Sequence, residues 1–307
     1  MKVQSISVLF SQSQFTDIQL ERLVGLGKVS FLEGASVKCP KDTELLAVNP
    51  EAFGGAVKVR SRLLQLLDTL SHIKYVVLGS SGYSFLDLSY CRQRGIIVSH
   101  VPSHDAESKA EHVIALLLAC SRRILINDRR TYRRIYKPEP GFEIRGKRLG
   151  VVGSGPTAER VVYRARALGM IVYAEERFEG ALRKPIEFLL PSAELLTLHL
   201  PDSEQSSKFL NKERIKKLKA GSIVVNIGNR DWVDERAMNE ALISRKVDTY
   251  CFEADSIGKS PLKGNEFALM LKPFSTYTKE TMERNQEAMV NNIERIARGL
   301  PYNKLDF

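Results

Sequence analysis

The 307-residue sequence has no hydrophobic run long enough to cross a membrane. Its longest apolar run of note, Val113 to Cys120, falls far short of the about 20 residues that a spanning helix needs. The first residues, MKVQSISVLFSQSQ, have neither the continuous apolar core nor the cleavage site of a secretory signal, and they predict a β-strand. With 43% apolar and 27% charged residues, the composition is that of a globular protein, which we expect to be cytoplasmic.

Cysteine is scarce, and its four positions (39, 91, 120 and 251) lie far apart. Zinc sites and disulfide frameworks need closer or paired spacings, and no CxxC or Cys/His cluster is present. The sequence therefore predicts no metal site, and it predicts buried free thiols in a reducing compartment.

Negative charge is also in short supply, because 46 basic residues face 36 acidic ones and give a net charge of +10. Part of the excess lies in residues 122–137, where seven basic residues accompany one Asp. Such a stretch can bind nucleic-acid phosphates, or it can form a solvated helix end or a subunit contact. The absence of an aromatic-rich nucleic-acid motif favours the second interpretation and disfavours nucleic acid as a partner.

The pattern of elements predicts an α/β protein with mostly parallel sheets covered on both faces. Short runs rich in Val, Ile and Leu alternate with amphipathic segments, such as the predicted helix over residues 60–70. A long helix is expected from Asp105, a good N-cap residue, and a last helix over 278–298 is closed by Gly299. The predicted strands cover residues 5–10, 28–32, 44–48, 73–79, 95–101, 148–152, 170–174, 195–200, 222–227, 249–254 and 268–271.

A glycine-rich turn after the strand at 148–152 predicts a dinucleotide site. Gly153, Gly155 and Ala158 fit the pattern G-x-G-x-x-G/A between a strand and a helix. The first glycine permits the tight turn, the second lets the backbone approach a pyrophosphate, and Ala158 lets the helix pack closely on the strand. The free N–H groups of the helix N-terminus then face the phosphates, and Pro156 in the first turn loses no needed hydrogen bond.

Glu176 ends the next predicted strand, where a carboxylate can accept hydrogen bonds from the ribose hydroxyls. It would repel a 2′-phosphate, so NAD is favoured over NADP as cofactor, although Arg177 and Lys184 lie close by. The alternative is a glycine turn in a sheet that binds no ligand.

Several stretches together resemble the D-isomer-specific 2-hydroxyacid dehydrogenases, a family that includes formate, glycerate and phosphoglycerate dehydrogenases. The resemblance covers nearly the whole chain. It includes GSSGYSFLDL (79–88), RGIIVSHVP (94–102), ESKAEHVIALLLA (107–119), GKRLGVVGSG (146–155), LHLPDSEQSSKFL (198–210) and LKAGSIVVNIGNRDWVDERAMNEAL (218–242).

The resemblance implies two doubly wound parallel-sheet domains. Residues 1–104 plus 276–307 would form a flavodoxin-like substrate domain, and residues 105–275 a Rossmann domain that binds NAD. Family members are usually homodimers that act on small anionic substrates, so 122–137 would lie at a subunit contact.

Site residues follow from the same resemblance, position by position. Ser80, Ser81 and Gly82 match a loop that holds a substrate carboxylate. The implied cofactor-binding residues are Gly153, Ser154, Gly155, Pro156, Thr157, Glu176, Arg177, His199, Leu200, Pro201, Ser206, Ile227, Gly228, Glu253 and Phe274.

The family's catalytic residues do not carry over. The Arg that polarises the ketone aligns with Asn229, the Glu aligns with Ser260, and the proton-donating His aligns with Phe274. No His occurs after His199. Ordinary keto-acid reduction by the family mechanism is therefore disfavoured, and Phe274 is expected to line an apolar pocket over the nicotinamide.

Candidate replacements are Lys109, which stands where the family usually has Val, and Arg230 next to Asn229; His104 and Tyr277 are weaker ones. Lys109 is the preferred candidate, because a Lys beside a cofactor can serve as an acid or bind a carboxylate. Two functions stay open: an NAD-dependent oxidoreductase with altered catalytic residues, and a catalytically silent NAD-binding protein.

Overall fold

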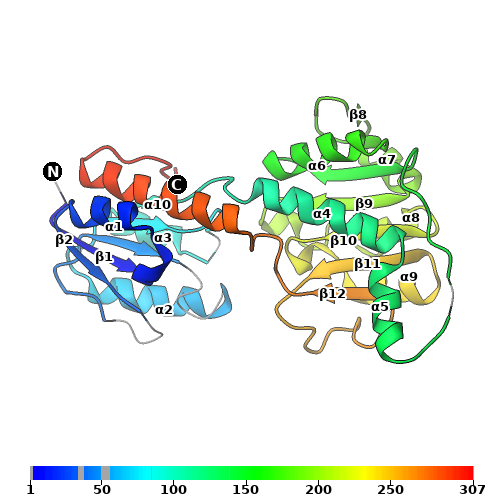
Figure 1. The fold of residues 1–307 in the computed structure, drawn as a ribbon, viewed down its shortest axis with the longest axis horizontal. Helices are drawn as coiled ribbons and strands as arrows, with labels where there is room; N and C mark the ends of the chain where they lie inside the picture. Colours follow the sequence, from blue (N-terminus) through cyan, green and yellow to red (C-terminus); the bar gives the residue numbers. More distant parts are fainter. Residues whose placement is uncertain (1–2, 34–37, 50–55, 84, 138, 307) are drawn as a thin grey trace. The chain divides into compact units, whose positions relative to one another are not determined.

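The computed structural model describes residues 3–33, 38–49, 56–83, 85–137 and 139–306. The chain divides into two compact units, each with its own sheet (Figure 1). Unit 1 consists of Met1–His104 and Lys279–Phe307, and unit 2 consists of Asp105–Thr278.

Unit 1 contains a parallel sheet in the order β2-β1-β3-β4-β5, the flavodoxin-like strand order. Its strands are β1 (Ser5–Leu9), β2 (Lys28–Phe31), β3 (Leu45–Val48), β4 (Tyr75–Leu78) and β5 (Ile97–Ser99). Its helices are α1 (Asp17–Val24), α2 (Ala56–Thr69), α3 (Leu88–Gln93), α10 (Lys279–Ala297) and the short 3-10 turn η1 (Gln12–Gln14).

Helices cover both faces of this sheet because alternate strand residues point to opposite sides. Helices α2 and α3 pack on the face that presents Leu46 and Val76. Helices α1 and α10 cover the face that presents Leu45 and Val77, and Figure 1 shows them on the opposite side of the sheet from α2. The last helix therefore completes the core of a unit that is otherwise built from the first third of the chain.

Unit 2 contains a parallel sheet in the order β12-β11-β10-β9-β6-β7-β8. Strands β6 and β9 are adjacent although β7 and β8 lie between them in sequence, which is the switch point of a Rossmann sheet. The strands are β6 (Arg148–Gly153), β7 (Ile171–Ala174), β8 (Leu182–Arg183), β9 (Leu195–His199), β10 (Ser222–Asn226), β11 (Val247–Glu253) and β12 (Ala268–Leu271).

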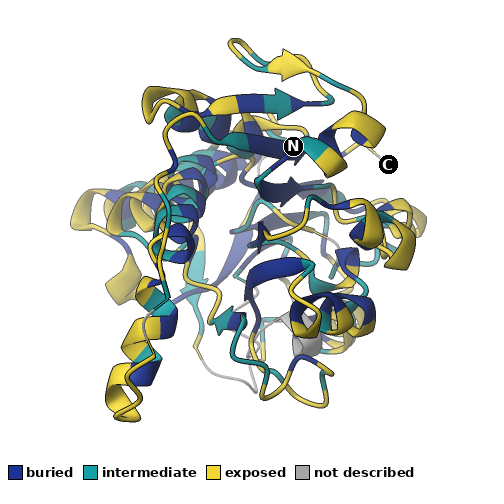
Figure 2. Ribbon diagram, turned by 90° about the vertical axis from the view of Figure 1, so that its right-hand side faces the viewer, coloured by how far each residue is buried: buried dark blue, intermediate teal, exposed yellow. Residues whose placement is uncertain are grey.

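The helices of unit 2 form two layers around the sheet, with buried strands and exposed outer helix faces (Figure 2). One layer contains α4 (Ala106–Ser121), α5 (Ile124–Tyr132) and α6 (Pro156–Ala167). The other contains α7 (Ile186–Ser192), α8 (Lys212–Lys217) and α9 (Glu235–Ile243), and the 3-10 turns η3 (Glu204–Ser206) and η4 (Arg230–Trp232) lie in loops.

The α/β class and the doubly wound parallel sheets predicted from the sequence are confirmed. All four cysteines are free, and three of them are buried. Within the described residues, no helix combines the length and the apolar character that a membrane span requires. In the same part of the chain, no cluster of three or more His, Cys, Asp or Glu side chains is arranged to bind a metal ion.

Two expectations about the region around α4 need correction. Asp105 occupies the N-cap position of α4, but its side chain makes no capping hydrogen bond and pairs with Lys109. The basic stretch at 122–137 is not uniformly solvated, because Arg123 is 9% exposed and pairs with Asp248. Arg130 is 3% exposed and pairs with acidic side chains as well. These two arginines fix α5 to the body of unit 2.

Candidate functional site

The glycine turn of unit 2 has a geometry that only glycine satisfies at its first position. Gly153 ends β6 with φ of +99°, and a Cβ there would lie 2.1 Å from the carbonyl oxygen of His199 on the adjacent strand β9. Gly155 has φ of +92°, but no described atom lies within 4 Å of the position that a Cβ would take. The turn is therefore closed on the sheet side and open at Gly155, where α6 begins with Pro156.

A cavity of about 170 Å³ lies beside this turn. Among the described residues that line it there is no acidic side chain. The turn, the N-terminus of α6 and the ends of β9 and β10 contribute to it, and α4 adds Lys109. The lining residues are Lys109, Ser154, Pro156, Thr157, Leu198, His199, Leu200, Ile227, Gly228 and Trp232.

The lining gives the cavity a positive character. Helix α6 presents its N-terminus, and Lys109 brings an ammonium group from the neighbouring helix whose charge the Asp105 carboxylate partly offsets. The Lys109 Nζ lies 2.6 Å from an Asp105 carboxylate oxygen, and its side chain keeps 29% of its surface exposed. An anion in the cavity would meet a cation that a single carboxylate already orients.

His199 contributes a neutral imidazole to the same cavity. Burial, together with the nearby Lys109 charge, lowers the pKa of His199 to about 3. A 3.1 Å hydrogen bond joins its Nε2 to the Thr197 hydroxyl and fixes the ring. At neutral pH this residue is a polar, uncharged wall.

The cavity brings together seven of the residues predicted to bind the cofactor, and with them the predicted catalytic candidate Lys109. Glu176 and Arg177 are exposed beyond the end of β7, as is Pro201 after β9, and Ser206 is buried in η3. Trp232, the only tryptophan of the chain, lines the cavity but no sequence pattern predicts it. A Cβ on Gly228 would clash with its ring at 2.2 Å, so the ring packs directly against that backbone.

Glu253 at the end of β11 is engaged inside the protein. One carboxylate oxygen accepts the N–H groups of Phe274 and Ser275 at 2.9 and 2.8 Å, and the other accepts the Ser275 hydroxyl at 2.7 Å. His112 from α4 places its Nε2 3.2 Å from the same carboxylate. Glu253 therefore fixes the segment after β12 in addition to any role toward a ligand.

Phe274 does not line the cavity, and the residue is 58% exposed. Its described ring contact is with Tyr277, at 6.5 Å between centroids. The ring lies on the surface of the described structure, whereas its backbone N–H is held by Glu253.

Asn229 uses both ends of its side chain within unit 2. The amide nitrogen donates to Asp202 at 2.7 Å, and the oxygen accepts the Asp231 N–H at 2.9 Å, which caps η4. A contact with a ligand would require at least one of these bonds to break.

Arg230 and Ser260 meet at Glu235, the first residue of α9. Arg230 Nε donates to one Glu235 oxygen at 2.8 Å, and the Ser260 hydroxyl donates to the other at 2.6 Å. Arg230 also donates to the Ser256 carbonyl and lies over the Phe252 ring. Arg230, predicted as a candidate catalytic residue, thus has its guanidinium held on three sides within unit 2, and a contact with a ligand would require some of these interactions to break.

The predicted substrate loop, Ser80 to Gly82, follows β4 in unit 1. Its three carbonyl oxygens all accept internal hydrogen bonds, from the Val101 N–H, the His100 ring and the Ser80 hydroxyl. The loop is thus fixed by the segment that follows β5.

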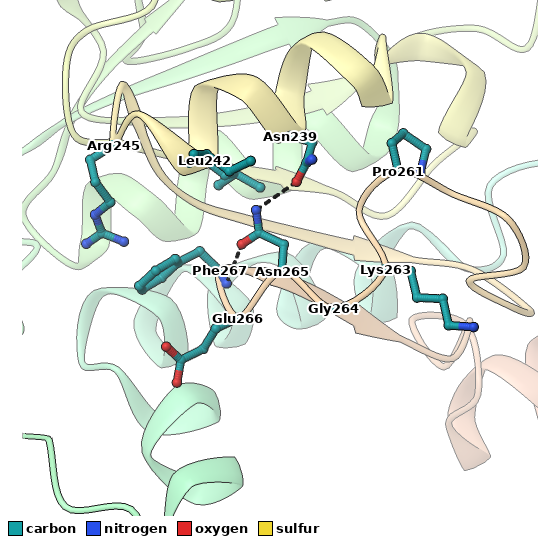
Figure 3. Close-up of a pocket in the computed structure, with 10 residues that line it drawn as sticks. Asn239, Leu242, Arg245, Pro261, Lys263, Gly264, Asn265, Glu266 and Phe267 are labelled. Atoms are coloured by element: carbon teal, nitrogen blue, oxygen red, sulfur yellow. Dashed lines mark hydrogen bonds between the residues drawn. The ribbon is translucent and has the colours of Figure 1, made fainter.

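A second cavity, of about 360 Å³, lies near the amino ends of β11 and β12 (Figure 3). Its polar groups are largely paired with one another or with neighbours. Asn265 donates to Asn239 at 2.8 Å, and Arg245 lies over the Phe267 ring and pairs with Asp248. This cavity lies at the opposite edge of the sheet from the glycine turn. Because most of its polar groups are paired, it resembles an ordinary surface groove rather than a binding site.

Comparisons with known proteins agree with this architecture. The family model described as "D-isomer specific 2-hydroxyacid dehydrogenase, NAD binding domain" matches residues 114–274, more than half of the chain. A D-3-phosphoglycerate dehydrogenase of Archaeoglobus fulgidus is 31% identical over 264 residues, which cover 80% of this chain and 50% of that protein. A hydroxypyruvate reductase of Thermotoga maritima is 29% identical over 227 residues, which cover 70% of this chain and 73% of that protein.

The chain spans about half the length of the phosphoglycerate dehydrogenase that it matches. Among solved structures, a D-lactate dehydrogenase from Aquifex aeolicus with NAD and lactic acid has a TM-score of 0.78. It is 22% identical and covers 96% of both chains, which demonstrates a shared fold. By the family match, residues 114–274 contain an NAD-binding domain, and the chain belongs to the D-isomer specific 2-hydroxyacid dehydrogenase family.

Proposed function

We propose that the chain is an NAD-dependent oxidoreductase that acts on a small anionic 2-hydroxy or 2-keto acid with an altered set of catalytic residues. The observation that carries this proposal is the cavity beside the glycine turn, which Lys109 lines and which lacks an acidic wall within the described residues. The nicotinamide cofactor, when bound, would accept the hydride in one direction of the reaction and donate it in the other.

The residues of unit 2 have distinct roles in this proposal. The N–H groups around Gly155 and Thr157 bind the cofactor pyrophosphate, because a helix N-terminus attracts anions. Glu176 accepts hydrogen bonds from the ribose hydroxyls and disfavours a 2′-phosphate. His199 remains uncharged, and with Trp232 it excludes water from one side of the cavity.

Lys109 takes the place of the cation that the aligned Asn229 cannot provide. Its ammonium group can hold an oxyanion or a carbonyl oxygen of the substrate, and Asp105 keeps it oriented. In unit 1, Ser80, Ser81 and Gly82 hold the substrate carboxylate. We further propose a cytoplasmic homodimer, with residues 122–137 at the subunit contact and no nucleic-acid partner.

A second candidate function is a catalytically silent NAD-binding protein. Asn229 and Ser260, which align with the family's Arg and Glu, are taken up by hydrogen bonds to Asp202 and Glu235. Phe274, at the position of the family's His, carries no proton. In this alternative the cavity still binds the cofactor, and the bound protein acts as a sensor or in a partner interaction.

The discriminating experiment measures NADH oxidation with a panel of 2-keto acids for the wild type, Lys109→Ala and the surface control Lys263→Ala. The proposal expects turnover in the wild type and the control and a loss of at least tenfold in Lys109→Ala. NADH binding without turnover on any acid of the panel would support the silent alternative for this substrate class. Absence of NADH binding would refute both.

A further inference from the structure

The amino edge of the unit 2 sheet carries a concentration of positive charge that the roles assigned so far leave unused. The segments that lead into β6, β9, β10 and β11 are residues 143–148, 192–195, 216–222 and 243–248. Together they contain eight basic residues and three acidic ones, an excess of five in a chain whose net charge is +10. We define the basic edge as five of these cations, all exposed or half-buried: Arg145, Lys147, Arg148, Lys219 and Lys246.

Backbone hydrogen bonds fix these segments side by side. The Gly221 N–H donates to the Lys246 carbonyl at 2.9 Å, and the Ile223 N–H donates to the Glu194 carbonyl at 3.0 Å. The Glu194 N–H in turn donates to the Arg148 carbonyl at 2.9 Å. Because adjacent strands lie about 4.8 Å apart, the row from Lys246 to Arg148 crosses three strand spacings, or about 14 Å.

Glu194, which precedes β9, places one carboxylate within this row. One of its oxygens lies 3.1 Å from the Lys219 Nζ and 3.6 Å from the Lys147 Nζ. The other lies 3.4 Å from the Arg148 Nε. Three cations therefore share a single negative charge, and they keep 34%, 37% and 36% of their side-chain surface exposed.

Helix ends account for only part of the positive charge. Helices α8 and α9 both end beside the basic edge, and a helix C-terminus attracts cations with about half a unit of negative charge. Lys147 and Arg148, however, follow a loop rather than a helix. Arg145 and Lys246 form no ion pair within the part of the chain that the structure describes. The basic edge is therefore left with positive charge that the protein itself does not neutralise.

The layout of this charge fits an extended acidic polypeptide. A small anion can contact only one or two of the cations in a row about 14 Å long. An extended peptide rises about 3.3 Å per residue and presents alternate side chains on one side, so carboxylates at positions i, i+2 and i+4 span about 13 Å. The four segments contain no aromatic residue on which nucleic-acid bases could stack. We propose that the basic edge is a docking surface for an acidic polypeptide segment of a partner protein.

The basic edge and the cofactor cavity lie at opposite ends of the same strands. The cavity is built from residues at and beyond the carboxyl ends of β9 and β10, together with the glycine turn after β6. The basic edge precedes or begins its strands and shares no residue with the lining of the cavity. Docking at the basic edge and NADH binding can therefore be tested separately.

The experiment measures the fluorescence anisotropy of a labelled peptide of about four Glu-Ser repeats, titrated with the full chain in about 50 mM salt. The wild type should bind the peptide saturably, and the double variant Lys219→Ala/Lys246→Ala should bind it at least about tenfold more weakly. Lys38→Ala/Lys41→Ala removes the same charge from exposed positions of unit 1 and should change the affinity by less than about twofold. Circular dichroism checks that both double variants fold.

Cross-linking with a carbodiimide, followed by mass spectrometry, maps the bound peptide, because the reagent joins a carboxylate to a lysine amine in contact with it. We expect cross-links at Lys147, Lys219 or Lys246. The proposal is overturned if the wild type does not bind the peptide, if both double variants bind it equally, or if only other lysines are cross-linked. A single-stranded oligonucleotide of equal charge that binds more tightly, and that loses affinity in Lys219→Ala/Lys246→Ala, would assign the surface to nucleic acid instead.

Discussion

Two neighbouring regions at the carboxyl edge of the unit 2 sheet differ in how many internal partners their polar side chains have. At the ends of β6 and β9, the glycine turn, Lys109 and the start of α6 surround a cavity with no acidic wall in the described structure. At the ends of β10 to β12, Asn229, Arg230 and Ser260 bond to Asp202 and Glu235. In the described structure Lys109 of the first region pairs with Asp105 alone, whereas each of the three side chains in the second region makes at least two interactions within unit 2.

The difference bears on our proposal that the chain keeps a cofactor site while its catalytic residues are altered. A ligand-binding region needs polar groups without fixed partners, because each internal bond must break before a ligand can replace it. By this criterion an anion in the cavity beside the glycine turn would displace fewer internal bonds, chiefly the Lys109–Asp105 pair, than a ligand at Asn229, Arg230 or Ser260. Asn229 and Ser260, which we propose to stand at catalytic positions of the family, instead connect loops, as Glu253 does for residues 274 and 275.

The largest effect is expected from Gly153→Ala. The new Cβ would lie 2.1 Å from the His199 carbonyl at a residue with positive φ, so we expect a loss of about 3 kcal/mol in unfolding free energy and loss of NADH binding. Urea unfolding monitored by circular dichroism measures the first, and equilibrium dialysis the second. Gly155→Ala is the matched control: it has positive φ and no steric contact, and should lose only about 1–2 kcal/mol. Equal losses of unfolding free energy in the two variants would contradict the closed geometry at Gly153.

Acidification should weaken unit 2 through His199. Its pKa is about 3 when folded and near 6.5 when unfolded, so between these values the unfolded chain binds a proton that the folded chain does not. The unfolding free energy then falls as pH falls, by about 2 kcal/mol between pH 6.5 and pH 5. His199→Gln should reduce the loss between pH 7 and pH 5. If His199→Gln loses as much unfolding free energy as the wild type between pH 7 and pH 5, His199 is solvated and becomes charged in the folded protein.

Lys109→Met tests the positive character of the cavity. Removal of the charge should weaken NADH binding about tenfold, or about 1.4 kcal/mol, because the cofactor loses a nearby cation. Isothermal titration calorimetry measures the affinity, and Lys109→Arg should recover most of it. Lys263→Met serves as the control in the second cavity, and a similar loss there would point to a general charge effect.

Glu235→Gln tests the region at the ends of β10 to β12. Of the variants described, it should have the smallest effect on stability and on NADH binding. It weakens the bonds to Arg230 and Ser260, both partly solvated, so we expect a loss of about 1 kcal/mol in unfolding free energy. NADH affinity should change by less than about twofold, since Glu235 does not line the cavity. A large loss of NADH affinity with intact folding would show that the two regions are coupled.

The sequence predicted those features that local patterns specify. Strand periodicity and the glycine spacing gave the parallel sheets and the turn, because both follow from residues close together in the chain. Glu235 was missed because its bond to Ser260 joins residues 25 positions apart, and no pattern marks such a pair. Lys109 was predicted as a candidate, but its place beside His199 depends on how α4 packs on the sheet.

Asp105 and Phe274 illustrate the same limit at single residues. Asp105 has the type and position of an N-cap, yet Lys109 one turn later offers its carboxylate a stronger, charged partner. Phe274 has the type of a pocket residue, but hydrogen bonds to Glu253 fix its backbone while the ring lies exposed. Residue type alone does not indicate which of several nearby groups a side chain will contact.

The most direct test of the central claim is a titration with NADH monitored through the emission of Trp232. This residue is the chain's only tryptophan and lines the cavity, so bound NADH should quench it through energy transfer. The account predicts saturable quenching with one site per chain that Lys109→Met weakens and Glu235→Gln preserves. Unchanged Trp232 emission at saturating NADH would contradict the claim that this cavity binds the cofactor.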